Sequence, residues 1–331
     1  MPIALVTGAT GLVGMHLAQR LRGDDWQVRA LVRDASRAEP LARIGVTLTI
    51  GDTLEPAGFA RAARGCDVVF HAAAAVTPDG GWEAFRRPNI DGTANAIEAA
   101  AAAGARLVHV SSVAVYGGTA RYARGDRATR EESPLAPLPA GAFYARSKRE
   151  SEALVLDAHA AGRLWATAVR PDVIYGKYDR QFVPRLARML RHGIAPVVGG
   201  GLTTLAVVHA ANVADGMVRA ATHEGAGGRA YNLANDYDVS VAEFFRLAGE
   251  GLGVRLRMLS IPIPIARAAL RVVTTVVPRR FEAAMGASLN FLTRDNPFTS
   301  ERARRELGWD PPVRPEAGVV DAFRWWAAQR Q

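Results

Sequence analysis

The first half of the chain alternates between short apolar runs and amphipathic stretches. Apolar runs predict strands at 2–7, 28–32, 46–50, 67–71, 106–111 and 165–170, and helical periodicity predicts helices at 12–22, 56–64, 83–103 and 142–161. Strands that alternate with helices indicate right-handed βαβ units and a parallel sheet. We therefore expect a doubly wound α/β domain over residues 1–171.

The pattern becomes less regular after Pro171. It predicts helices at 180–192, 211–222, 240–252, 263–277, 300–307 and 315–329, with short strands at 205–209 and 230–233. We expect residues 172–331 to form a smaller, mostly helical lobe, from which some strands and helices return to the sheet. Arg267 and Arg271 interrupt the strongly apolar segment 261–277 on one helix face. This segment fits a helix that covers a pocket, or alternatively a helix on a membrane surface.

Composition narrows the class of protein. The chain has 331 residues, of which 49% are hydrophobic and 22% charged, which excludes a disordered chain and a disulfide scaffold. A single cysteine, Cys66, cannot form an internal disulfide. The first residues lack the basic-then-apolar order of a signal peptide, and no apolar run is long enough to span a membrane. We expect a cytoplasmic protein with no integral membrane segment and no metal site.

The positive charge comes almost entirely from arginine. Lys and Arg number 41 against 32 Asp and Glu, which gives a net charge of +9, and only Lys148 and Lys177 are lysines. The arginines are dispersed, which favours a compositional bias over a nucleic-acid surface, so we expect no nucleic-acid partner. Lysine is retained where a compact ammonium with an adjustable pKa is needed, and this marks Lys148 and Lys177 for attention.

A glycine-rich turn follows the first predicted strand. Residues 5–14 read LVTGATGLVG, so that Gly8, Gly11 and Gly14 lie between a strand and a helix. In such a turn Gly8 allows the sharp bend, Gly11 lets the backbone approach a pyrophosphate, and Gly14 lets the helix pack on the strand. The phosphates would lie against Thr10, Leu12 and Val13 at the helix N-terminus. The sequence therefore predicts a Rossmann-type dinucleotide site.

Tyr144 and Lys148 lie four residues apart on the helix predicted at 142–161 and share one face. A phenol that exchanges protons near neutral pH needs its pKa lowered by roughly three units, and a nearby ammonium lowers it. We therefore expect Tyr144 to act as acid or base and Lys148 to lower its pKa and hold the nicotinamide ribose.

These motifs together resemble the extended (atypical) short-chain dehydrogenase/reductase family of the NAD-dependent epimerase/dehydratase type. The resemblance also covers Gly51-Asp52-Thr53, the turn from His71 to Ala74, the stretch from Asn89 to Thr93, and Glu306 to Pro311. It implies that the cofactor is bound by Asp52, Thr53, Ala72, Ala73, Ala74 and Asn89. It also implies that Ser112 orients the substrate oxygen, that Pro171 and Val173 pack on the nicotinamide, and that helices 83–103 and 142–161 form a homodimer.

The cofactor choice depends on the end of the second strand. Arg33 stands where members of the family that prefer NADP carry a cation for the 2′-phosphate, and Arg37 could assist. Asp34 could instead bind the ribose hydroxyl of NAD. We expect NADP, with NAD as the alternative.

The substrate expectation rests on what the chain lacks. Val113 and Ala114 stand where dehydratases of the family carry an acid pair, and Leu205 stands where epimerases carry an arginine. The second half is apolar and resembles the 3β-hydroxysteroid dehydrogenase and dihydroflavonol reductase branch. We expect hydride transfer to or from a carbonyl or carbinol carbon of a small, mainly hydrophobic substrate held by Ser112, Phe182 and His209. A nucleotide-sugar epimerase and a non-catalytic NADP-sensing module are the alternatives.

Overall fold

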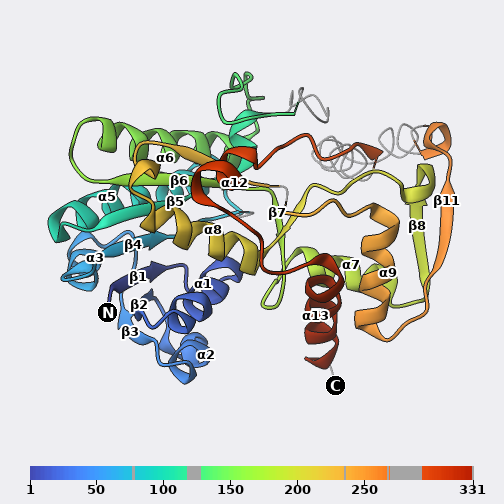
Figure 1. Cartoon of the computed structure of the whole chain (residues 1–331), viewed down its shortest axis with the longest axis horizontal. Helices are drawn as coiled ribbons and strands as arrows, with labels where there is room; N and C mark the ends of the chain where they lie inside the picture. Colours follow the sequence, from blue (N-terminus) through green and yellow to red (C-terminus); the bar gives the residue numbers. More distant parts are fainter. Residues whose placement is uncertain (77–78, 118–127, 235, 267, 269–292, 330–331) are drawn as a thin grey trace.

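A seven-stranded parallel sheet forms the centre of the molecule (Figure 1). The computed structural model describes residues 1–76, 79–117, 128–234, 236–266, 268 and 293–329. The strands are β1 (Ile3–Thr7), β2 (Gln27–Val32), β3 (Thr47–Ile50), β4 (Val68–His71), β5 (Arg106–Val110), β6 (Ala166–Pro171) and β10 (Ala230–Leu233), in the order β10-β6-β5-β4-β1-β2-β3. The order reverses between β1 and β4. In doubly wound sheets ligands bind at the carboxyl ends of the strands at this point.

Helices cover both faces of the sheet (Figure 1). The helices α1 (Leu12–Gly23), α2 (Glu39–Arg43), α8 (Ala210–Thr222) and α12 (Glu301–Leu307) share one hydrophobic core, and α3 (Pro56–Ala63), α5 (Gly92–Ala103) and α6 (Phe143–Ala160) share the other. The helix predicted at 83–103 is two helices: α4 (Gly81–Arg86) continues through a π-helical turn (Arg87–Asp91) into α5. The doubly wound Rossmann-type prediction is confirmed.

The second half builds a lobe beside the sheet. It contains α7 (Phe182–Leu190), α9 (Val241–Leu252) and α13 (Pro315–Ala328), which pack around a separate hydrophobic core. Two short parallel sheets complete it: β7 (Val173–Tyr175) pairs with β9 (Val207–His209), and β8 (Ile194–Val198) pairs with β11 (Arg257–Ile261). The pattern did not predict β7, β8 or β11.

The chain returns from the lobe to the central sheet. The strand predicted at 230–233 is β10, which pairs with β6, and α8 packs against α1. This matches the expectation that some elements after residue 171 rejoin the sheet, while the division at 171/172 stays a prediction. Of the helix predicted at 263–277, only residues 263–266 and 268 are described, and they are helical.

Candidate active site

The glycine-rich turn connects β1 to α1. Gly8 has a φ of +65°, and a Cβ on it would lie 2.7 Å from the backbone nitrogen of Ala73; a Cβ on Gly14 would lie 2.3 Å from the carbonyl oxygen of Gly8. A Cβ on Gly11 would meet only that same oxygen, at 3.1 Å, so the space before Gly11 is open. The first turn of α1 has no side-chain cap. Uncapped N–H groups beside open backbone fit a dinucleotide pyrophosphate.

Predicted cofactor residues after β3 and β4 lie at the same edge of the sheet. Ala73 N–H donates to Thr7 Oγ1 at 3.3 Å, which ties the turn from Ala72 to Ala74 to the end of β1. Asp52, after β3, accepts a hydrogen bond from Leu54 N–H at 3.0 Å, and the backbone oxygen of Thr53 accepts one from the Asn95 amide. The structure therefore brings these residues together at the carboxyl edge.

Asn89 has a different position from the one expected. Its side chain is buried, its Oδ1 accepts from Ala75 N–H at 2.7 Å, and its Nδ2 donates to Ala75 O and to Ser147 Oγ, each at 2.9 Å. The amide therefore clamps the turn after β4 against α6. Asn89 therefore fixes the shape of the turn beside the predicted cofactor site, and its amide is not exposed to a ligand.

Basic side chains surround a cavity beyond the end of β2. Arg33 and Arg37 are exposed, while Asp34 accepts hydrogen bonds from Ser36 N–H at 2.9 Å and Ser36 Oγ–H at 2.7 Å, which lower its pKa. A cavity of about 410 Å³ lies here, lined by Thr10, Met15, Arg37, Pro40, Tyr178, Asp179, Arg180, Trp325, Trp326 and Gln329. Arg180, from the second half of the chain, donates to the backbone oxygen of Thr10 at 3.3 Å.

Ser112 and Tyr144 meet at the ends of β5 and α6. Ser112 is the N-cap of a short 3-10 helix (Val113–Tyr116), and its Oγ accepts from Ala114 N–H at 3.2 Å. Burial raises the pKa of Tyr144 above its usual value, and a hydrogen bond with Ser112 opposes this increase. The expectation that Lys148 lowers the Tyr144 pKa is wrong for this structure. The reason is that the ammonium points elsewhere.

Lys148 is only 2% exposed, and its Nζ donates to the backbone oxygen of Val110 at 2.5 Å. Burial lowers the pKa of Lys148 to about 8, and the carboxylate of Glu152 partly opposes this. The rings of His71 and His109 stack nearby at 5.6 Å in neighbouring strands. Burial and then the charge of Lys148 lower the pKa values of both histidines. Lys148 therefore brings a positive charge into this interior.

Sequence reasoning missed a buried ion pair beneath Lys148. Glu152 Oε1 lies 2.6 Å from Arg170 Nη2, and Arg170 Nη1 donates to the Tyr116 hydroxyl at 2.8 Å. That hydroxyl in turn donates to Asn232 Oδ1 at 2.8 Å. The pair joins α6 to β6, the strand that ends at Pro171, which we expect to pack on the nicotinamide. The four-residue spacing from Lys148 to Glu152 could have suggested this position, because it places both on one helix face.

Asp172 is a half-buried carboxyl that the sequence did not indicate. It follows β6, and its Oδ1 accepts from Val173 N–H at 2.7 Å, while Oδ2 is buried with no hydrogen-bond partner among the described residues. Burial raises the pKa of Asp172 to about 8. A carboxyl of this kind is largely protonated at neutral pH and can donate a hydrogen bond.

The remaining predicted residues divide between the sheet edge and the lobe. Pro171 ends β6, and Val173 begins β7 and packs on the lobe core. Phe182 also packs on that core, with its ring 5.9 Å from Phe244. His209 is buried and caps α8 by accepting from Ala211 N–H at 3.2 Å. The structure does not bring Phe182 or His209 to Ser112 in any described contact, so their substrate role stays a prediction.

Comparison with known proteins places the chain in a family. Residues 4–234 match the NAD dependent epimerase/dehydratase family, and the chain belongs to it. With the glycine turn and the Tyr144–Lys148 pair, this makes the protein an NAD(P)-dependent oxidoreductase of the short-chain dehydrogenase/reductase type. Among the described residues, no helix has the length and apolar character needed to cross a membrane.

The chain is similar to several characterised reductases. It is 33% identical to a 4-hydroxy-2-methyl-3-oxo-4-farnesyl-3,4-dihydroquinoline-1-oxide ketoreductase of Stigmatella aurantiaca, over 96% of this chain and 95% of that protein. It is 31% identical to a ceramide reductase of Caulobacter vibrioides, over 79% and 74%. The fold matches the dTDP-glucose 4,6-dehydratase DesIV of Streptomyces venezuelae, solved with NAD, with a TM-score of 0.73 and 23% identity over 99% and 98%.

Proposed function

We propose that the protein reduces a ketone of a mainly hydrophobic substrate, or oxidises the matching alcohol, with NADP as the preferred cofactor. The hydrogen bond between Ser112 and Tyr144 at the carboxyl edge of the sheet carries this proposal. It places the hydroxyl groups of Ser112 and Tyr144 together, and Tyr144 lies one helical turn before the buried Lys148. Two converging hydroxyl donors suit a carbonyl oxygen that gains negative charge during reduction.

The residues of the chain divide the chemistry between them. When bound, the dinucleotide supplies or accepts the hydride. In reduction, Tyr144 donates its phenolic proton to the substrate oxygen, and its raised pKa keeps that proton in place until then. Ser112 Oγ accepts from Ala114 N–H, and its own hydrogen, which is donated to the Tyr144 oxygen before substrate binds, would turn to the substrate oxygen. Lys148 would hold the nicotinamide ribose.

The preference for NADP is supported by the end of β2. Asp34 is the residue that would bind the ribose hydroxyl of NAD. Its Oδ1 already accepts two hydrogen bonds from Ser36, so this oxygen is less available to a ribose. Arg37 and Arg180 line the cavity at Thr10, and Arg33 is exposed after β2. None of the three forms an ion pair with a carboxylate among the described residues. Unpaired guanidinium groups suit a phosphate, to which they can donate two hydrogen bonds at once.

The substrate class is supported by the relatives. The names of two of them specify a farnesyl quinoline-oxide and a ceramide, both of which carry long hydrocarbon groups. Leu205, where an epimerase would carry a cation, is buried in the lobe core. An apolar surround with two polar groups at one end is typical of sites for hydrophobic ligands.

The test is a panel of long-chain, steroid and flavonoid ketones with NADPH, followed by the loss of reduced cofactor absorbance. We expect turnover on at least one hydrophobic ketone and none on UDP-glucose or dTDP-glucose. Interconversion of sugar nucleotides without net cofactor oxidation would replace this proposal with an epimerase. Tight NADPH binding without turnover of any substrate would favour the sensing module.

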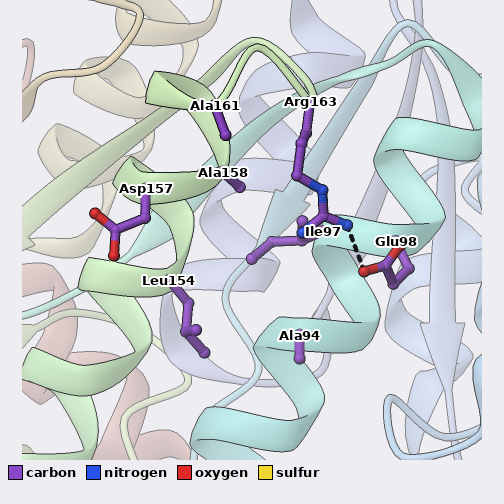
Figure 2. A pocket seen from close by; sticks show the side chains of 8 residues that line it. All are labelled: Ala94, Ile97, Glu98, Leu154, Asp157, Ala158, Ala161 and Arg163. Atoms are coloured by element: carbon purple, nitrogen blue, oxygen red, sulfur yellow. Dashed lines mark hydrogen bonds and ion pairs between the residues drawn. The ribbon is translucent and has the colours of Figure 1, made fainter.

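We also propose that the protein is a homodimer through α5 and α6. A groove of about 290 Å³ lies between these helices. Figure 2 shows the residues that line it: Ala94, Ile97, Glu98, Leu154, Asp157, Ala158, Ala161 and Arg163. Small alanine side chains allow close approach of a second pair of helices, and Leu154 is exposed beside them. Light scattering should report twice the chain mass, and Leu154→Arg should reduce it to that of one chain.

A further inference from the structure

An apolar surface lies at the tip of the lobe, on the outer face of β8 and β11. The register pairs Ile194 with Arg257 and Pro196 with Leu259, and neighbouring residues of this kind point to the same face. The alternate residues Ala195, Val197 and Met258 belong to the lobe core. On the strands themselves Ile194 (49%) and Leu259 (41%) are exposed, and in the segments next to them in the sequence Met189 (41%), Leu202 (81%) and Ile265 (58%) are exposed. We call this set the lobe-tip patch.

Arginines lie beside the lobe-tip patch in the sequence. Arg188 and Arg191 lie on either side of Met189, at the end of α7, and Arg255 and Arg257 lead into β11. All four are exposed, and none forms an ion pair with a carboxylate among the described residues. The sequence has no Asp or Glu from residue 180 to 214 or from 251 to 281, although the chain has 32 in total. The surface is therefore apolar and positively charged at once.

The exposed apolar side chains and the exposed arginines together indicate which kind of partner this surface would bind. A phospholipid surface with negative headgroups accepts apolar side chains at the acyl boundary and arginine at the phosphates. A second copy of the chain does not suit the patch, because a two-fold contact would place the same unpaired arginines against one another. Nucleic acid would use the arginines and leave the apolar side chains in water.

The location of the patch leaves the cofactor site accessible. Figure 1 shows β8 and β11 at the edge of the molecule opposite to β1, β2 and β3, whose carboxyl ends carry the predicted dinucleotide site. We propose that the lobe-tip patch docks the protein on the surface of anionic phospholipid membranes, with Ile194 and Leu259 at the acyl boundary and Arg255 and Arg257 at the lipid phosphates. This proposal is independent of the substrate proposed above.

The experiment measures co-sedimentation of the full-length protein with vesicles. Vesicles of phosphatidylcholine alone are compared with vesicles that also contain phosphatidylglycerol, at one fixed salt concentration, and we expect binding only where phosphatidylglycerol is present. In a second series the salt concentration is raised, and we expect binding to the phosphatidylglycerol vesicles to decrease. Replacing Arg255 and Arg257 together by serine should lower the partition coefficient by about thirtyfold, at about 1 kcal/mol for each arginine. Leu259→Asp should also abolish binding.

A matched control uses arginines at the other end of the molecule. Replacing Arg61 and Arg64, which are exposed on and after α3, by serine removes the same charge and should leave vesicle binding nearly unchanged. Equal losses in the two double variants would show a general charge effect and overturn the proposal. Equal binding to both kinds of vesicle, or binding to neither, would also overturn it. So would a decrease in the solution mass of Leu259→Asp, since the patch would then be a contact between copies.

Discussion

The interior beneath Tyr144 and the lobe-tip patch use the same residue types in opposite ways. Beneath Tyr144, charged side chains are buried and each has a partner: Lys148 has the oxygen of Val110, and Arg170 has Glu152. At the lobe tip, the arginines are exposed without carboxylate partners among the described residues, and apolar side chains face solvent. A buried charge can therefore hold the proposed catalytic groups in place, whereas an exposed charge remains available for a ligand from outside.

The largest expected effect comes from removing the proposed proton donor, the hydroxyl of Tyr144 in the buried region. Tyr144→Phe keeps the ring, its packing and the shape of the site but removes the hydroxyl, so the substrate oxygen cannot receive its proton. We expect turnover to fall by roughly 10²–10⁴-fold, while the dissociation constant of NADPH measured by fluorescence changes little. Tyr237→Phe serves as the control, because that hydroxyl bonds Pro311 in the lobe. Unchanged turnover in Tyr144→Phe would remove the assigned role.

A buried ion pair should be far more costly to break than an exposed one. Glu152→Gln leaves the Arg170 guanidinium buried without its carboxylate and should lower the free energy of unfolding by about 3 kcal/mol or more. Glu39→Gln breaks the exposed contact with Arg43, 2.7 Å long in the structure, and should cost less than about 1 kcal/mol. Urea unfolding of both variants measures the difference. Similar losses would show that the comparison between buried and exposed charge is wrong.

Sequence alone predicted the parts of the site that depend on local spacing. The glycine turn, the helix that carries Tyr144 and Lys148, and most strands of the central sheet follow from periodicity and motif. The pairing of Glu152 with Arg170 did not follow, because it joins a helix to a strand 18 residues further along. Strands β8 and β11 are also paired across a long separation, and neither has the alternating pattern of a half-buried strand. Contacts between residues far apart in the sequence were therefore what the sequence analysis could not predict.

The two lysines of the chain allow a direct test of the cost of a buried charge. The Lys148 pKa of about 8 lies below its ordinary value of 10.5, so the unfolded chain binds more protons between these pH values. The free energy of unfolding therefore rises with pH from about 8 to 10.5. Below pH 8 the folded protein carries the full cost of burying the charged ammonium, about 3 kcal/mol. Lys148→Met removes that cost but also the bond to Val110, so it should stabilise the protein at pH 7 by about 2 kcal/mol.

The same measurement on Lys177 provides the control. Lys177 is partly exposed and lies 2.7 Å from Asp321, so Lys177→Met should change the free energy of unfolding by less than about 1 kcal/mol at any pH. Thermal unfolding of both variants at pH 7 and pH 10 separates the two cases. A Lys148→Met protein that is less stable than the native one at pH 7 would show that the ammonium contributes more through its hydrogen bond than burial costs.

The smallest expected effect concerns Arg33, which is exposed and unpaired like the lobe-tip arginines but lies at the cofactor edge. If such an arginine is free for a ligand, Arg33→Ala should weaken NADPH binding by about tenfold, the lower range for a hydrogen bond to a charged group. NADH lacks the 2′-phosphate, so its affinity should remain the same. Arg61→Ala, which removes an exposed arginine from α3, should affect neither cofactor. Equal weakening of NADPH and NADH by Arg33→Ala would mean that this arginine contacts a part common to both, and the preference for NADP would then lack its principal support.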